Sequence, residues 1–103
     1  MSATMVDINR FRGRFFEVLE ETDRSQTAVM TIGPGADAGA EETHAVDQII
    51  YVVEGEATVR IEEHEYHAKA GACVLIPAGA HHHVKNPGTA SLFFLTIYTP
   101  PAY

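Results

Sequence analysis

The 103-residue chain has a single cysteine, few basic residues and no long apolar run. Because only one cysteine is present, Cys73 has no internal disulfide partner, and we expect it to be a small buried residue in a strand. Seven basic residues against fourteen acidic ones give a formal charge of −7. This argues against nucleic acid or an anionic membrane as the main partner, because both require a basic face.

No stretch approaches the roughly 18 apolar residues of a membrane-spanning helix. The polar beginning, MSATMVDINRFRGRFF, lacks the pattern of a secretory signal peptide. We therefore expect a cytoplasmic protein with no membrane partner.

Hydrophobic residues make up 46% of the chain and are spread along its whole length, which is typical of a globular protein. A chain of this length has room for one hydrophobic core. We predict a single domain over residues 1–103, with the core of the barrel in residues 26–100. Residues 1–13 are expected to form an N-terminal extension or an edge strand.

Short strand-like runs separated by turn residues recur along the chain, and no segment has a convincing helical period. The runs are residues 14–20, 26–32, 48–53, 57–62, 66–69, 72–76, 82–85 and 91–98. Sequences rich in Gly, Pro, Asn and acidic residues lie between them and favour turns. Many short strands of this kind predict an all-β sandwich or barrel with antiparallel pairing.

The most distinctive segment is GACVLIPAGAHHHVKN, which begins at Gly71. A β-prone run is followed by a Pro-Ala-Gly turn and by a returning strand that opens at His82. The spacing of Gly71, Pro77, Gly79, His82 and Asn86 matches the second signature motif of the cupin superfamily, and the segment resembles that family closely. The resemblance implies a double-stranded β-helix, the jelly-roll-like cupin barrel, in which His82 is a metal ligand.

The first cupin motif is present in a modified form. Gly55 takes the place of its closing glycine, six residues after Gln48, and His44 stands at its second histidine position. Glu42 occupies the position of the first histidine, and Gln48 that of the usual glutamate. The resemblance therefore implies Glu42, His44, Gln48 and His82 as the ligand set, with the carboxylate moved from position 48 to position 42.

Strand geometry gives an independent reason to group these side chains. In an extended strand, Glu42, His44 and Gln48 have the same parity and can point to one face. His82 would join them from another strand. Two histidines and one carboxylate suit iron(II), zinc and manganese, and nickel remains possible. Gln48 is either a weak fourth ligand or a group that hydrogen-bonds a substrate or water.

A less specific interpretation remains open for the same residues. Glu42 can belong to a solvated acidic loop, with His44 as a surface histidine beside it. His81 and His83 flank His82 but should point to the opposite face of the strand, so they are poor co-ligands.

Other residues bear on the cavity that the barrel would enclose. Ile50 and Val52 share the parity of Gln48 and are expected to line its wall, which favours a small and partly apolar ligand. Tyr98 can also reach the cavity, although an aromatic residue at that position is more often part of the core.

The predicted site allows two classes of function. A divalent ion can polarise a substrate with adjacent oxygens or bind substrate together with dioxygen. We therefore predict a metal-dependent enzyme, of the dioxygenase or isomerase/lyase type, that acts on a small oxygenated metabolite. The alternative is a non-catalytic module that binds a small molecule or a sugar. Apolar residues on both faces of 48–53 and 91–98 predict a homodimer.

Overall fold

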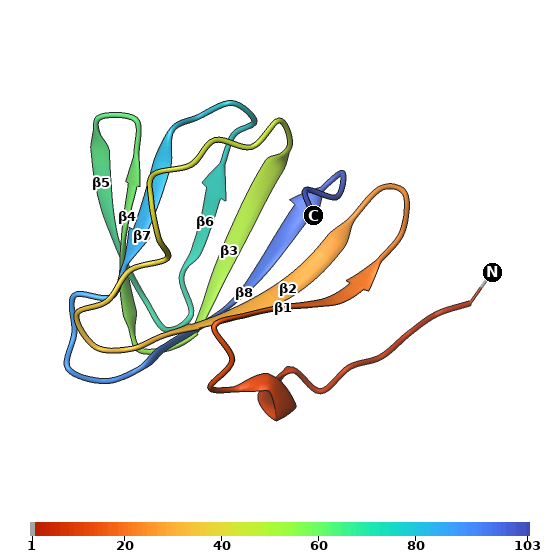
Figure 1. Cartoon of the computed structure of the whole chain (residues 1–103), viewed down its shortest axis with the longest axis horizontal. Helices are drawn as coiled ribbons and strands as arrows, with labels where there is room; N and C mark the ends of the chain where they lie inside the picture. Colours follow the sequence, from red (N-terminus) through yellow and green to blue (C-terminus); the bar gives the residue numbers. More distant parts are fainter. Residues whose placement is uncertain (1) are drawn as a thin grey trace.

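The computed structural model describes residues 2–103, and nearly all of its regular structure is β-strand (Figure 1). A short 3-10 helix, η1 (Ile8–Phe11), precedes the strands. These are β1 (Phe16–Glu21), β2 (Gln26–Ile32), β3 (Asp47–Glu54), β4 (Glu56–Ile61), β5 (His64–Lys69), β6 (Cys73–Ile76), β7 (His82–Lys85) and β8 (Leu92–Thr99). All eight predicted runs are strands, and their ends differ from the predicted ones by at most two residues.

The strands form two sheets with antiparallel pairing throughout. One sheet has the order β1-β2-β8-β3-β6, and the other has the order β5-β4-β7. The chain passes from one sheet to the other after β3, β5, β6 and β7, so the two sheets wind together as a double-stranded β-helix. This confirms the predicted fold class. The described residues include no helix with the length and apolar character that crossing a membrane requires.

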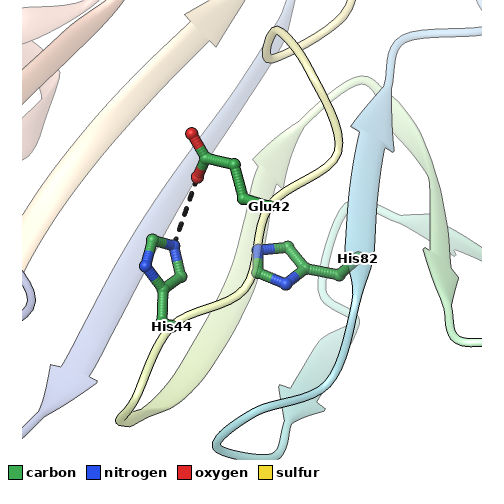
Figure 2. A group of neighbouring side chains, drawn as sticks. All are labelled: Glu42, His44 and His82. Atoms are coloured by element: carbon green, nitrogen blue, oxygen red, sulfur yellow. Dashed lines mark ion pairs between the residues drawn. The ribbon is translucent and has the colours of Figure 1, made fainter.

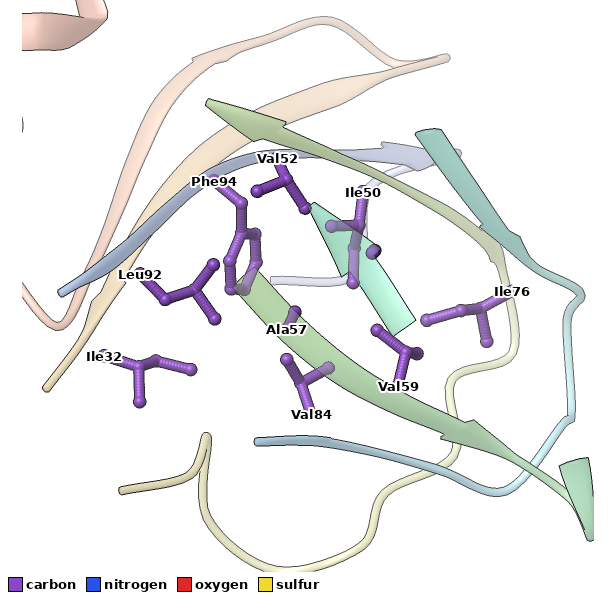
Figure 3. Close-up of a cluster of buried hydrophobic side chains, with 10 residues drawn as sticks. Ile32, Ile50, Val52, Ala57, Val59, Ile76, Val84, Leu92 and Phe94 are labelled. Carbon is purple, nitrogen blue, oxygen red and sulfur yellow. The ribbon is translucent and has the colours of Figure 1, made fainter. Parts of the chain in front are cut away.

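The core lies between the two sheets (Figure 3). Its ten buried side chains are Ile32, Ile50, Val52, Ala57, Val59, Ala68, Ile76, Val84, Leu92 and Phe94. They come from seven strands because each strand turns alternate side chains inward. Fully burying one of the larger side chains contributes roughly 1.5–3 kcal/mol. Packing of this kind holds the two sheets together and fixes the strand ends from which the site is built.

Two sequence-based expectations about burial are wrong. Ile50 and Val52 are fully buried in the core and do not line the cavity, because only Gln48, near the start of the same strand, reaches it. Cys73 is exposed rather than buried. It begins β6 at the edge of the larger sheet and lies opposite Tyr51, which is 42% exposed on the outer face.

Gly55 joins β3 to β4 in a conformation that other residues rarely adopt. Its φ is +84°, and a Cβ atom there would lie 2.5 Å from the carbonyl oxygen of Ser91. The glycine at this motif position therefore lets the β3–β4 turn pack directly against the segment that leads into β8.

Asn86 holds the turn between β7 and β8 and is fully buried. Its Nδ2 donates to the carbonyl oxygens of Ile32 (2.9 Å) and Ala90 (2.8 Å), and its Oδ1 accepts from the Gly88 N–H (2.9 Å). The side chain thus joins β2 to the turn before β8.

Candidate metal centre

The candidate site lies where the loop before β3 meets the first residue of β7. Glu42 and His82 form an isolated antiparallel bridge, in which each N–H donates to the other residue's carbonyl oxygen at 3.0 and 2.9 Å. The Gly79 N–H donates to the carbonyl oxygen of His44 at 2.7 Å, so the turn between β6 and β7 also holds His44. Glu42 and His44 precede β3, which begins at Asp47. Backbone hydrogen bonds to the β6–β7 turn and to His82, rather than pairing within β3, therefore bring the three residues together.

The three side chains turn toward one another (Figure 2). Each offers one ligand atom, and these atoms all lie within 4.8 Å of one another. Nε2 of His44 is 3.3 Å from Oε2 of Glu42, and the ring centroids of His44 and His82 are 5.2 Å apart. His82 is buried, whereas the Glu42 side chain is half exposed, so the cluster reaches from the interior to the surface.

Local contacts leave both histidines able to bind a metal. Nδ1 of His82 lies 3.1 Å from the carbonyl oxygen of Ala80. Because a carbonyl oxygen only accepts, Nδ1 carries the proton and Nε2 keeps its lone pair free, as in many metal-binding histidines. Burial lowers the pKa of His44, and the neighbouring His82 lowers it further, while Glu42 acts in the opposite direction. His44 is therefore neutral at pH 7, which is the form that binds metals.

Gln48 lies inside the cavity and is only 5% exposed. Its Nε2 donates to Oγ1 of Thr96 at 3.1 Å and, at 3.5 Å, to the hydroxyl of Tyr98. Its Oε1 is buried and has no hydrogen-bond partner among the described residues. An acceptor left in this state costs about 1–3 kcal/mol. The amide is therefore held by its donor side, and its acceptor side has no partner among the described residues.

The donor set fits a divalent ion. It contains two imidazole nitrogens and one carboxylate, together with the unpaired oxygen of Gln48. Iron(II), manganese and zinc accept such a mixture of nitrogen and oxygen ligands. A cation here would also give the buried Gln48 oxygen the partner that it lacks.

The cluster borders a cavity of about 220 Å³. The aromatic and apolar side chains that line it include Phe15, Phe16, Met30 and Phe94. Tyr98 and Tyr103 also line the cavity, and their rings meet His44 edge-on with centroids 5.5 and 5.6 Å away. The cavity thus has a polar end at the cluster and an apolar wall.

Tyr103 is held in place by Gln26, a buried residue of β2. Oε1 of Gln26 accepts from the backbone N–H groups of Ala102 (3.2 Å) and Tyr103 (3.1 Å), and Nε2 donates to the Tyr103 carbonyl oxygen (2.7 Å). The Tyr103 ring also packs against Phe16, with centroids 4.9 Å apart. These contacts fold residues 100–103 back over the cavity.

Both tyrosine hydroxyls beside the cluster are held in the protonated form. Burial raises the pKa of Tyr98, and Tyr103 raises it further. Burial also raises the pKa of Tyr103, with an added contribution from the Glu42 carboxylate. At neutral pH the two hydroxyls can therefore donate hydrogen bonds to a ligand in the cavity.

Of the residues named from sequence, Glu42, His44 and His82 come together, and Gln48 lies in the same cavity. His81 and His83 are not part of the cluster. Each instead has a ring nitrogen 3.3 Å from a carboxylate oxygen, His81 from Glu41 and His83 from Asp37. The remaining participants, Thr96, Gln26 and Tyr103, were not identified from sequence, because only long-range hydrogen bonds bring them to the site.

These features define a class of protein, namely a small double-stranded β-helix domain with a candidate metal site of histidine and carboxylate side chains at the mouth of its cavity. Residues 28–98 match the family model described as the cupin domain. The chain belongs to this family, and the resemblance seen in its two motifs is confirmed.

Individual relatives agree with this assignment. The chain is 29% identical over 106 positions to a Bacillus subtilis protein named "Uncharacterized protein YrkC", with 94% of this chain and 57% of the relative covered. It therefore spans a little over half the length of that relative. The crystal structure of BH2720 from Bacillus halodurans is 29% identical and superposes with a TM-score of 0.91, covering 99% of this chain and 84% of the other.

A conserved protein from Klebsiella pneumoniae, described as having a double-stranded β-helix domain, resembles the chain in fold. It is 23% identical with a TM-score of 0.86, and 99% of this chain and 95% of the other are covered. At this identity the similarity supports the architecture and no particular chemistry.

Proposed function

We propose that this cupin binds a divalent metal ion through Glu42, His44 and His82, with Gln48 as a fourth group, and that the site acts on a small oxygenated organic molecule. The observation that carries the proposal is the convergence of three ligand atoms at a cavity that Gln48, with its unpaired amide oxygen, also lines. Manganese, iron and zinc are favoured over nickel, because one nitrogen donor of the usual cupin set is replaced here by a carboxylate oxygen.

The reaction that we propose is of the isomerase/lyase or dioxygenase type. A bound divalent ion supplies Lewis-acid chemistry or, if it is iron, the capacity to bind dioxygen. The protein contributes the cavity that orients the substrate. The hydroxyls of Tyr98 and Tyr103 contribute hydrogen bonds to an oxygen of the substrate.

Metal analysis of the purified protein and its variants tests the ligand set. Wild type dialysed against Mn²⁺ or Zn²⁺ should retain about one ion per chain, and Glu42→Gln and His82→Ala should each retain much less. His81→Ala is a matched control, because it removes an adjacent histidine that pairs with Glu41 at the surface. Retention of metal by both ligand variants at the wild-type level would refute the site.

A non-catalytic binding module is the second candidate, and the composition of the cavity favours it in one respect. Among the described residues that line the cavity, Glu42 is the only carboxylate, and His83, the one histidine there outside the proposed ligand set, lies 3.3 Å from Asp37, so neither a second carboxylate nor an unpaired imidazole is present to act as a general base. The two functions differ in turnover. Metal-loaded protein incubated with small 2-oxo and 2-hydroxy acids should change their NMR spectra or consume dioxygen if it is an enzyme. A binding module should bind them saturably and leave them unchanged.

We further propose that two copies of the chain associate through the outer face of the larger sheet. On this face Leu75 is 58% exposed and Tyr51 is 42% exposed, and Leu75 lies beside Ile49 in the β3–β6 pair. A contiguous exposed apolar surface of this kind is typical of a protein interface. Light scattering at micromolar concentration should give the mass of a dimer, and a monomer there would contradict the proposal.

A further inference from the structure

We propose that the cavity is selective for a small ligand with one negative charge and two adjacent oxygens on an apolar or aromatic body. Tyr103 forms the wall that recognises this body, and Gln26 holds Tyr103 in position. A 2-hydroxy or 2-oxo acid with an aryl or branched alkyl substituent has this chemistry. The inference rests on the proposed metal site and adds to it the class of ligand and the residues that select it.

The charge of the ligand follows from the charges around the site. A divalent ion with Glu42 as its only anionic ligand leaves a single positive charge, since the two histidines and Gln48 are neutral ligands. Among the described residues that line the cavity there is no Lys or Arg, and no other acid. At the buried end of the site, formed by His82 and Gln48, a remaining positive charge favours a ligand that neutralises it. A ligand with one negative charge achieves this, whereas a neutral diol does not.

The apolar part of the ligand follows from the opposite side of the cavity. Phe16, Met30 and Phe94 present only carbon and sulfur atoms, so a polar ligand would lose hydration there without gaining hydrogen bonds. The cavity volume of about 220 Å³ lies below the range of roughly 300–1,000 Å³ that accommodates drug-sized ligands. The body is therefore small, about the size of one phenyl ring.

Tyr103 has the geometry of a selective wall. Its ring lies between Phe16 and His44, with centroids 4.9 and 5.6 Å away, so it joins the apolar side of the cavity to the metal cluster. Its backbone N–H and carbonyl oxygen make two hydrogen bonds to the side chain of Gln26, and the N–H of Ala102 makes a third. Gln26 does not line the cavity, and it is therefore a positioning residue that acts through Tyr103.

Three probe molecules test the two parts of the ligand separately. Mandelate has a phenyl body and an anionic head with adjacent oxygens, glycolate has the same head without the body, and 1-phenylethane-1,2-diol has the body with a neutral head. Calorimetric titration into the Zn²⁺-loaded full chain should give mandelate an affinity about tenfold or more above that of glycolate. Mandelate should exceed the diol by a similar factor. Equal affinity for mandelate and glycolate, or for mandelate and the diol, would overturn the inference.

Variants assign the selectivity to its residues. Tyr103→Ala should reduce the preference for mandelate over glycolate about fivefold, and Tyr103→Phe should retain it because the ring remains. Gln26→Ala should behave as Tyr103→Ala does, because it releases residues 100–103. Tyr66→Ala is the matched control, since Tyr66 is 48% exposed on β5 and does not line the cavity. If Gln26→Ala does not fold, the two Tyr103 variants decide the question.

Titration with Zn²⁺ alone separates this inference from the proposed function. The Tyr103 variants should bind the ion as wild type does, because Tyr103 is not among the proposed ligands. Failure of wild type to bind Zn²⁺ would contradict the proposed function itself. Wild-type Zn²⁺ binding combined with an unchanged mandelate preference in Tyr103→Ala would contradict only the inference drawn here.

Discussion

Replacing Gln48 with leucine should have opposite effects on the metal-free and the metal-loaded protein. In the metal-free form, the buried Oε1 of Gln48 has no partner among the described residues, and this costs about 1–3 kcal/mol. Gln48→Leu removes that cost, together with the hydrogen bond to Thr96, which contributes about 0.5–1.5 kcal/mol, and the weaker one of 3.5 Å to Tyr98. The hydroxyl of Thr96 keeps Tyr98 as a partner. The metal-free variant should therefore be about 0–2 kcal/mol more stable than wild type.

With metal, the change reverses because the ligand set has lost an oxygen. At a free Zn²⁺ concentration of about 100 times Kd, wild type gains about 2.7 kcal/mol from binding. A tenfold weaker affinity reduces that gain to about 1.4 kcal/mol at the same concentration. One kcal/mol corresponds to about 4–8 °C in Tm for a domain of this size. The metal-induced increase in Tm should therefore be about 5–10 °C smaller in the variant.

Thermal unfolding followed by circular dichroism, with chelator and then with Zn²⁺, measures both quantities on one sample. Thr96→Val is the control, since it removes the nearer of the amide's two hydrogen-bond partners while leaving Gln48 in place. The reasoning fails if Gln48→Leu is less stable than wild type without metal and keeps the full metal-induced shift. Gln48 would then be a packing residue whose oxygen has no role at the site.

Three further predictions concern stability, titration and assembly. Asn86→Ala should lower the free energy of unfolding by about 2–4 kcal/mol in urea titrations, because it leaves the buried carbonyl of Ile32 unpaired. Tyr98 has a pKa raised above its ordinary value of 10, so above that pH the unfolded chain loses a proton that the folded protein retains. Stability should therefore be intact below about pH 10 and fall at higher pH, and ultraviolet titration that loses one late step in Tyr98→Phe would assign that step to Tyr98. Leu75→Glu should convert a dimer to monomers in light scattering without changing the metal content, because Leu75 lies on the outer sheet face.

The parts of the fold that were predictable from the sequence are those governed by local patterns. Alternating apolar residues and Gly/Pro turns identified eight strands, and the spacing from Gly71 to Asn86 selected one barrel among several β architectures. Burial was predicted less well. Cys73 lies in a β-prone run and was expected to be buried, but its strand is at the edge of a sheet and its side chain is exposed. A local pattern predicts the strand but not its place in the sheet, because strand order depends on long-range pairing.

The candidate site divides in the same way. The spacing of Glu42 and His44 from Gly55 identified both residues. The sequence predicted that they lie in an extended strand with Gln48, but they precede β3, and an isolated bridge joins Glu42 to His82. Tyr103 has no comparable signal. Its place beside the cluster depends on Gln26, which is 77 positions away in the chain.

The position of the single carboxylate should lower the cost of folding before any metal binds to the proposed ligands. The Glu42 side chain is 51% exposed, whereas Gln48 is 5% exposed and sits beside Thr96 and Tyr98. A carboxylate at position 48 would be desolvated with no cation beside it, and its charged form would be strongly disfavoured. With the charge at the solvated mouth and a neutral amide in the interior, the metal-free protein avoids that penalty. The remaining cost is the unpaired oxygen of Gln48, which is the smaller of the two, and an ion bound by that oxygen would remove it.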